Sequence, residues 1–291
     1  MTTIAQKGVF QKLLITLDMI KFQHSLFAMP FALASLFYAT QGKPGWKTFL
    51  LIILAMVTAR NAAMSFNRIA DFTIDQKNPR TQNWPLVRGD LSRPFAMGFC
   101  IMNCGLFLFT AFLFNKMAFV LSPVALIILL GYSLTKRFTN FTQIFLGLAL
   151  GISPLGAWIA ATSSFHLFPV FLGLGVLFWV AGFDLIYSTQ DYDFDKTKGI
   201  KNLVVRLGIP KALILSKIFH IICLGFFMIA GISQNLGLWY FFGIFLIGTF
   251  LIFEHSLVKS NDLSKINKAF FTMNGYVSLS FLAFSLLDIY F

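Results

Sequence analysis

Acidic residues are scarce in this chain of 291 residues. There are only 11 of them, and Glu254 is the single glutamate. Charged residues of both signs make up 12% of the sequence, whereas a soluble domain carries about 25% because its surface must face water. With 57% hydrophobic residues and a mean hydropathy of +0.77, the composition excludes a soluble globular protein and predicts an integral membrane protein.

Cysteine is equally scarce. Cys100, Cys104 and Cys223 lie inside apolar stretches without a C-x-x-C pair, which predicts packed small side chains rather than disulfides or metal ligands. The first residues also lack the apolar core and small-residue cleavage site of a signal peptide. We therefore expect the first apolar span to remain in the mature protein.

Lysine and arginine outnumber the acids by 23 to 11, which gives a net charge of +12. Such an excess can indicate a nucleic-acid partner. Here, however, the basic residues lie in short segments between long apolar runs, as the positive-inside rule of membrane proteins requires. We expect a lipid bilayer and no nucleic acid as the partner, and no obligate protein partner is evident.

About 20 mostly apolar residues cross the hydrocarbon core as a helix. Nine segments meet this requirement, which predicts an all-α, polytopic membrane protein with nine transmembrane helices in one bundle. No segment has the length or polarity of a separate soluble domain, so residues 1–291 are expected to form a single domain. The expected spans are 13–41, 47–68, 95–114, 118–135, 141–161, 167–188, 210–232, 236–256 and 270–290.

The connections between these spans alternate in charge. Those after the second, fourth, sixth and eighth spans carry most of the Lys and Arg, and the others carry only Lys43, Lys47 and Lys116. This asymmetry predicts a protein of the cell inner membrane with its N-terminus in the cytoplasm and its C-terminus outside. Windows 71–90 and 184–195 hold seven of the eleven acids, and both would then face the cytoplasm.

The first acidic window follows the second span and reads R-N-A-A-M-S-F-N-R-I-A-D-F-T-I-D from Arg60 to Asp75. On a continuous helix Asn67, Asp71 and Asp75 stand at positions i, i+4 and i+8, and Arg60 lies two turns earlier. All four are therefore expected on one stripe of the helix.

The second acidic window follows the sixth span and reads D-L-I-Y-S-T-Q-D-Y-D-F-D from Asp184 to Asp195. On a helix Asp184, Asp191 and Asp195 share a face with Tyr187 or Ser188, whereas Asp193 points elsewhere. Stacked carboxylates repel one another, and near apolar membrane they also cost desolvation energy. The arrangement therefore calls for a compensating cation.

Oxygen ligands on two helices, with no His or Cys nearby, suit Mg²⁺, which keeps several waters and binds a few carboxylates together with substrate phosphates. Two alternatives remain open. The aspartates are solvated loop residues that neutralise nearby cations, or they form a proton relay in a secondary transporter. The transporter explains them less well, because they lie at helix ends rather than at mid-span.

Cations converge on the same side of the predicted bundle. Lys136 and Arg137 end the fourth span, Lys21 and His24 lie at the polar start of the first, and Arg60 lies within hydrocarbon depth. An arginine at that depth costs about 2.5–3.5 kcal/mol and marks a functional candidate. Orientation of the spans alone would also explain Lys136 and Arg137. Together, carboxylates and a cationic rim in an apolar bundle predict a site for a lipid diphosphate.

These motifs resemble the UbiA superfamily of membrane aromatic prenyltransferases. The resemblance rests on N-x-x-x-D-x-x-x-D followed by K-N-P-R-T, on G-F-D-L-I-Y-S-T-Q-D-x-x-F-D, and on Y-x-x-x-K-R ending at Arg137. It extends along essentially the whole chain and is strongest to the bacterial 4-hydroxybenzoate polyprenyltransferase group. Many relatives have Asn-Asp where this chain has Asn67-Arg68.

The resemblance implies a role for each candidate residue. Lys136, with Lys21 and Arg137, would neutralise the leaving pyrophosphate, Arg60 would lie near the aromatic acceptor, and Asp184 or Tyr187 would position or deprotonate the ring. The implied reaction transfers a polyprenyl group from polyprenyl diphosphate to an aromatic acid in ubiquinone biosynthesis, through an allylic carbocation. The implied Mg²⁺ ligands are Asn67, Asp71, Asp75, Asp191 and Asp195.

Other interpretations compete with this one. A related branch performs the same chemistry on a naphthoate-type acid for menaquinone synthesis through futalosine. A CDP-alcohol phosphotransferase is also Mg²⁺-dependent and membrane-embedded, but its D-G-x-x-A-R signature is absent from this sequence. Prenyl chain length and the identity of the acceptor are left open by the sequence.

Overall fold

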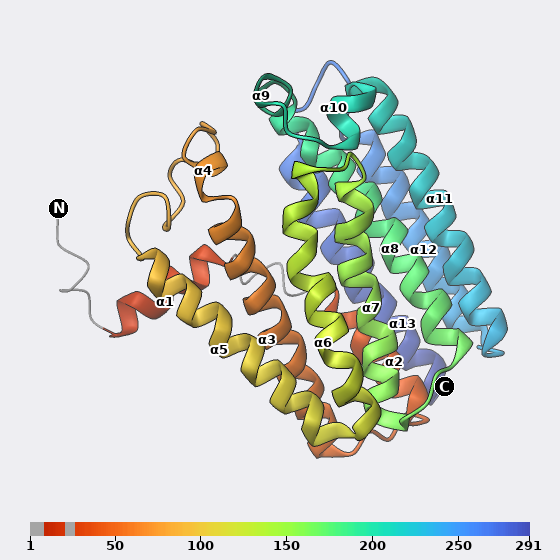
Figure 1. The fold of residues 1–291 in the computed structure, drawn as a ribbon. Helices are drawn as coiled ribbons and strands as arrows, with labels where there is room; N and C mark the ends of the chain where they lie inside the picture. The colour runs from red at the N-terminus through yellow and green to blue at the C-terminus, as the bar shows by residue number, and fades with distance from the viewer. Residues whose placement is uncertain (1–8, 21–26) are drawn as a thin grey trace.

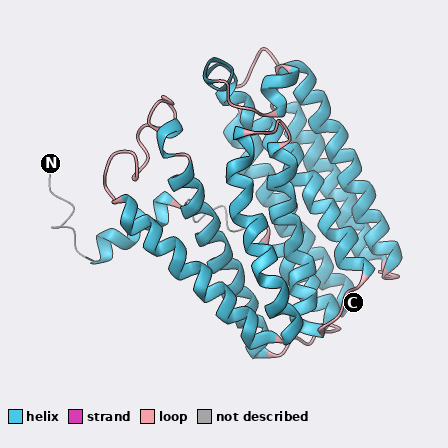
Figure 2. Ribbon diagram, in the orientation of Figure 1, coloured by secondary structure: helices cyan, strands magenta, loops and turns pink. Residues whose placement is uncertain are grey.

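The computed structural model describes residues 9–20 and 27–291, and this part of the chain contains helices and no strand (Figure 2). The long helices are α3 (Trp46–Ala70), α5 (Arg93–Phe114), α6 (Lys116–Gly131), α7 (Thr142–Thr162), α8 (Leu167–Ser188), α11 (Ile209–Ser233), α12 (Leu238–Ser256) and α13 (Asn274–Tyr290). The shorter elements are α1 (Val9–Met19), α2 (Met29–Ala39), α4 (Phe72–Asp75), α9 (Tyr192–Lys198), α10 (Leu203–Leu207), the 3₁₀-helices η3 (Tyr132–Arg137) and η4 (Thr189–Asp191), and the π-helix η5 (Lys268–Met273).

Eight helical stretches in the described residues are long and apolar enough to cross a membrane, against the nine predicted. They coincide with the second to ninth expected spans. The all-α, polytopic architecture is therefore confirmed, and the count of nine full-length spans is not.

The difference lies in the first expected span, 13–41. Helix α1 ends at Met19, and α2 begins at Met29 and has only 11 residues. Pro30 at the start of α2 explains this boundary, because a proline fits the first turn of a helix and breaks a helix that is already under way. Lys21 and His24 lie outside the described residues.

Helix α8 forms the centre of the bundle. It packs against α7 so closely that a Cβ added to Gly173 would clash with the carbonyl oxygen of Gly151. Close approach at small residues is how membrane helices gain packing energy without a hydrophobic driving force between them. Helices α5 and α6, by contrast, bury few of their apolar side chains completely, as lipid-facing helices do.

The elements that end in acidic residues meet at one end of the bundle. Figure 1 shows α4 and α9 at the same end, with α3 and α5 side by side on one flank and α7, α8 and α11 on the other. The C-terminus lies at the opposite end. We call the end that carries α4 and α9 the acidic end.

Candidate functional site

A cavity of about 620 Å³ opens at the acidic end, between α3 and α4 on one side and α8 and α9 on the other. Arg137 lies beside it. The two acidic windows, more than a hundred positions apart in the sequence, thus share one cavity. The predicted site residues that line it are Arg60, Asn67, Asp71, Asp75, Lys136, Asp184, Tyr187, Asp191 and Asp195.

Asp71 is the most enclosed carboxylate of the first window. Its Oδ2 accepts hydrogen bonds from Asn67 Nδ2 at 2.9 Å and from Lys136 Nζ at 2.5 Å. Arg137 Nη2 lies 3.6 Å from its other oxygen, Oδ1. Lys136 and Arg137 end the helical stretch formed by α6 and η3, so this stretch delivers two cations to the end of α3.

The predicted continuous stripe from Arg60 to Asp75 is wrong in one respect. Helix α3 ends at Ala70, where Asp71 leaves helical geometry with φ −93° and ψ 2°, and Asp75 belongs to the separate helix α4. Asp75 nevertheless turns back into the cavity. Burial raises the pKa of the Asp75 carboxyl to about 6, although the positive charge of Arg68 opposes this rise.

Asp191, in the second window, is held by the loop that follows α4. Arg80 donates to both carboxylate oxygens, from Nε to Oδ1 at 2.9 Å and from Nη2 to Oδ2 at 2.5 Å. Asn78 Nδ2 donates to Oδ1 at 3.0 Å, and Arg80 Nη1 donates to the Tyr187 hydroxyl at 3.1 Å. This two-pronged pairing matches the planar fork of a guanidinium to a carboxylate.

Asn78 and Arg80 were not selected as site residues from the sequence. The signal was present, because both belong to the K-N-P-R-T segment that carries the family resemblance. That segment lies in a basic loop, where orientation in the membrane is a sufficient explanation of an arginine. Only the fold shows that the loop reaches residues 111 positions away.

The predicted continuous helix of the second window is also broken, because α8 ends at Ser188, Asp191 belongs to η4 and Asp195 belongs to α9. Asp184 lines the cavity from α8, and Asp195 Oδ2 accepts a hydrogen bond from Asn202 Nδ2 at 2.8 Å. Asp193 is exposed and does not line the cavity. Tyr187 packs against Phe270, with the ring centroids 4.1 Å apart.

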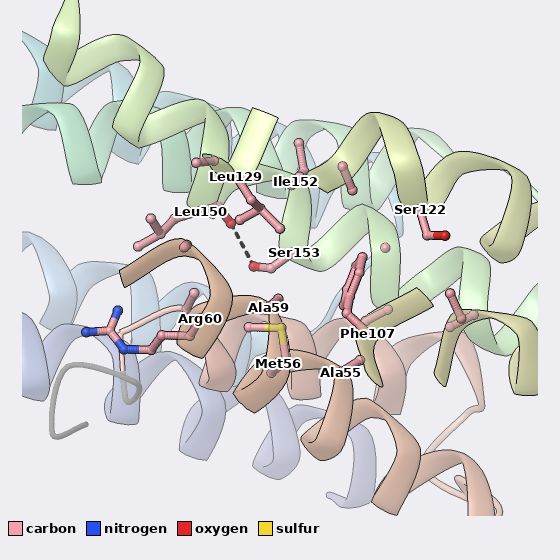
Figure 3. Close-up of a pocket in the computed structure, with 18 of the residues that line it drawn as sticks. Ala55, Met56, Ala59, Arg60, Phe107, Ser122, Leu129, Leu150, Ile152 and Ser153 are labelled. Carbon is pink, nitrogen blue, oxygen red and sulfur yellow. Dashed lines mark hydrogen bonds between the residues drawn. The ribbon is translucent and has the colours of Figure 1, made fainter. Parts of the chain in front are cut away.

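Arg60 links this polar cavity to a second, apolar cavity of about 220 Å³ between α3, α5, α6 and α7. Figure 3 shows Arg60 at one end of the apolar cavity, with its guanidinium directed away from Phe107 and Ser122. The α3 part of the lining includes the small side chains of Ala55, Ala59 and Ala63. The two cavities together form a polar chamber that adjoins an apolar one.

Arg68, which follows Asn67 in the sequence, holds other segments against α3. Its Nε donates to the Met19 carbonyl at 3.1 Å, and its guanidinium carbon lies 3.6 Å above the Trp84 ring. It is buried, and it faces the cavity while it ties α1 and the loop after α4 to α3.

The carboxylate and amide oxygens that line the polar cavity are the kind of ligand that a hard cation prefers. In the described residues no three His, Cys, Asp or Glu side chains are already gathered around one point, because Lys136 and Arg80 occupy Asp71 and Asp191. Asp71 Oδ1 is buried and accepts no hydrogen bond, however. A buried carboxylate oxygen in this condition, in a cavity of oxygen donors, suits Mg²⁺.

Comparison with known proteins agrees with this geometry. The model of the UbiA prenyltransferase family matches residues 28–276. The 4-hydroxybenzoate octaprenyltransferase of Shewanella piezotolerans is 30% identical over 255 residues, which cover 87% of this chain and 88% of that protein. The resemblance seen in the sequence motifs is therefore confirmed.

Solved structures show the same fold. The apo structure of a UbiA homolog from Aeropyrum pernix K1 superimposes with a TM-score of 0.82 and 31% identity, over 91% of this chain and 98% of that one. A UbiA homolog from Archaeoglobus fulgidus, bound to GPP and Mg²⁺, has a TM-score of 0.73 and 22% identity, over 94% of this chain and 99% of that one.

Proposed function

The chain belongs to the UbiA prenyltransferase family and is an alkyl-transferring enzyme of the membrane, and we propose that it prenylates an aromatic acid. The donor in this proposal is a polyprenyl diphosphate and the acceptor is of the 4-hydroxybenzoate type, as in ubiquinone biosynthesis. The observation that carries the proposal is the polar chamber of carboxylates and cations that adjoins an apolar one at Arg60.

The polar chamber is proposed to bind the diphosphate. Asn67, Asp71, Asp75, Asp191 and Asp195 would hold Mg²⁺, an ion that the Archaeoglobus fulgidus homolog binds together with GPP. When bound, the metal supplies positive charge that stabilises the departing pyrophosphate. Lys136, Arg80 and Arg137 add positive charge at the same place. Lys21 stays a prediction.

The binding step in this proposal is an exchange of partners. Lys136 and Arg80 now neutralise Asp71 and Asp191. With the diphosphate bound, Asp71 and Asp191 would be among the residues that hold the metal, and Lys136 and Arg80 would donate to the phosphate oxygens. The chamber therefore keeps its charges paired both before and after binding, which avoids bare carboxylates near the membrane.

The chemical step breaks the bond between C1 of the prenyl chain and the diphosphate oxygen, and forms a bond between C1 and a ring carbon of the acceptor. The allylic cation needs a dry wall with aromatic faces, which Tyr187 and Phe270 offer. Arg60 is proposed to pair with the acceptor carboxylate. Asp184 or Tyr187 would orient the ring and take the proton that it loses.

The apolar chamber is proposed to take the first part of the prenyl tail. Many of its lining side chains are small, which leaves room for an apolar chain. It adjoins the polar chamber, because Arg60, Met64 and Tyr132 line both cavities. The predicted orientation, with the acidic end toward the cytoplasm of the cell inner membrane, would let a soluble aromatic acid enter from the aqueous side.

The decisive experiment supplies the purified protein with Mg²⁺, one long-chain polyprenyl diphosphate and a panel of aromatic acids, and reads the products by mass spectrometry. Prenylated 4-hydroxybenzoate supports the proposal. Product only from a naphthoate-type acid replaces the acceptor and favours the menaquinone branch. Absence of both product and pyrophosphate release overturns the proposed reaction.

A further inference from the structure

A buried polar network lies behind the wall of the polar chamber, away from both cavities. It centres on Asn274, the first residue of α13, which is fully buried. Asn274 Nδ2 donates to Glu254 Oε1 on α12 at 2.9 Å, and Trp179 Nε1 on α8 donates to Asn274 Oδ1 at 2.6 Å. Glu254 is the only glutamate of the chain and is fully buried as well.

Retaining a carboxyl group at this depth is costly, so its contacts indicate what it does. On its far side His220 Nδ1 lies 3.9 Å from Glu254 Oε2 and 2.9 Å from His255 Nε2. His220 approaches α8 directly, since a Cβ on Gly182 would clash with its ring. Three helices thus fix Glu254 and Trp179 around the side chain of Asn274.

Asn274 in turn holds the π-helix η5. Besides Glu254, its Nδ2 contacts the carbonyl oxygens of Phe270 at 3.0 Å and Ala269 at 3.4 Å, which are four and five residues earlier. A π-turn has one residue more than an α-turn, so it rotates the side chains that precede it, and such turns are frequent at functional sites.

The side chains that η5 directs are part of the chamber wall. Phe270 and Phe271 both line the polar chamber, and Phe270 packs on Tyr187, which accepts a hydrogen bond from Arg80. A chain of contacts therefore runs from Glu254 through Asn274 and the π-helix to the aromatic wall. None of the network residues Glu254, Asn274, Trp179 and His220 lines the chamber itself.

We propose that Asn274, oriented by Glu254 and Trp179, is a positioning residue that fixes the π-helix and so keeps the Phe270 and Phe271 rings against the reacting end of the chamber, where they exclude water. This inference rests on the proposed prenyl transfer. Water that reaches the allylic cation attacks C1, loses a proton and yields prenyl alcohol, whereas the acceptor ring yields the prenylated acid. The ratio of prenyl alcohol to prenylated acid therefore measures how well the Phe270 and Phe271 rings exclude water.

The first test is Asn274→Ala, assayed for both products in one reaction. We expect the ratio of prenyl alcohol to prenylated acid to rise about tenfold, less than the hundredfold cost of a 1 Å displacement of a reacting group. Because a ratio does not depend on the amount of folded enzyme, general destabilisation leaves it unchanged. Hydrogen–deuterium exchange over 268–274 should become faster in the same variant, while exchange in α7 stays constant.

A matched pair of variants at Glu254 distinguishes the effect of its hydrogen bond to Asn274 from the effect of its charge. Glu254→Gln keeps an acceptor oxygen for Asn274 and should retain the wild-type ratio, whereas Glu254→Leu should reproduce the Asn274→Ala result. Where the leucine variant does not fold, Trp179→Phe carries the test, because it keeps an aromatic ring and removes the Nε1 donor, although it also shortens a fully buried side chain. A smaller rise in the ratio is expected for it.

Two outcomes overturn the inference: an unchanged ratio with unchanged exchange in Asn274→Ala, or a Glu254→Gln variant as impaired as Glu254→Leu. Failure of the proposed function looks different. In that case the wild-type protein makes no prenylated acid, while the exchange comparison of wild type and Asn274→Ala still decides whether Asn274 holds the π-helix.

Discussion

Asp71 and Asp191 face the same chamber, but they are neutralised in different ways. The cations of Asp71, Lys136 and Arg137, stand at the end of a membrane-spanning helical stretch. Arg80, the cation of Asp191, comes from the loop between α4 and α5. The Asp71 side chain is 4% exposed and that of Asp191 is 15% exposed.

The difference suggests a division of labour between the two sides of the chamber. A cation at the end of a packed helix holds its position when its partner leaves, so Lys136 is suited to meet the diphosphate as a fixed charge. A loop cation moves with its loop, so Arg80 is suited to close the chamber over a bound diphosphate. We therefore expect the loss of activity to decrease in this order: removal of the metal, loss of a carboxylate, loss of a cation.

Removal of the metal should affect the Asp71 side and the Asp191 side of the chamber equally, because both carboxylates are proposed to bind the same Mg²⁺. Treatment with EDTA should stop turnover completely, and added Mg²⁺ should restore it, measured as prenylated product by mass spectrometry. Turnover that persists in excess chelator would argue against a diphosphate enzyme that depends on Mg²⁺.

Loss of either carboxylate should be nearly as severe. Asp71→Ala and Asp191→Ala are each expected to lower kcat by at least about a hundredfold, the cost of removing one group that stabilises developing charge. Asp193→Ala is the matched control, since Asp193 is exposed and lies outside the chamber. Wild-type activity in either of the first two variants, with normal membrane insertion, would remove that residue from the metal site.

The two cations should then differ from each other. Lys136→Ala is expected to lower kcat by about a hundredfold, whereas Arg80→Ala should mainly raise KM for the diphosphate, by about tenfold. Arg80→Lys should recover little, because an ammonium lacks the two-pronged geometry that Asp191 now receives. Steady-state kinetics with varied donor measure both effects, and identical changes in kcat and KM would refute the division of labour.

Arg60, between the two chambers, should show an effect as small as that of Arg80, but on the other substrate. Arg60→Ala is expected to raise KM for the aromatic acid by about tenfold, the value of one charge-assisted hydrogen bond, and to leave KM for the diphosphate nearly constant. Kinetics with each substrate varied in turn provide the measurement. An equal rise in both constants would remove the proposed acceptor role.

Much of this fold is predictable because length and hydropathy decide which segments cross a bilayer. Alternation then brings the ends of the second and sixth spans to the same side, which is why Asp71 and Asp191 meet in one chamber. Hydropathy does not show where a helix ends within or just beyond a predicted span. The separate helices α1 and α2 and the end of α3 at Ala70 were missed for this reason.

The contacts made by loops and by irregular turns were also beyond the sequence pattern. Arg80 finds Asp191 across 111 residues, a distance at which periodicity carries no information. The π-helix before Asn274 leaves no repeat in the sequence, since one extra residue in one turn only shifts the phase of a helix. Both features follow from packing that the whole bundle creates.

The contact between Arg68 and Met19 has a consequence for biosynthesis. These residues are 49 positions apart, and the Trp84 ring that covers the guanidinium is synthesised later still. Helix α1 therefore leaves the ribosome before the loop after α4, and it cannot dock in its final place until that loop has been made. Domains tend to fold in the order of synthesis, and contacts between distant residues form slowly. At this end of the molecule, α1 waits for partners that are synthesised after it.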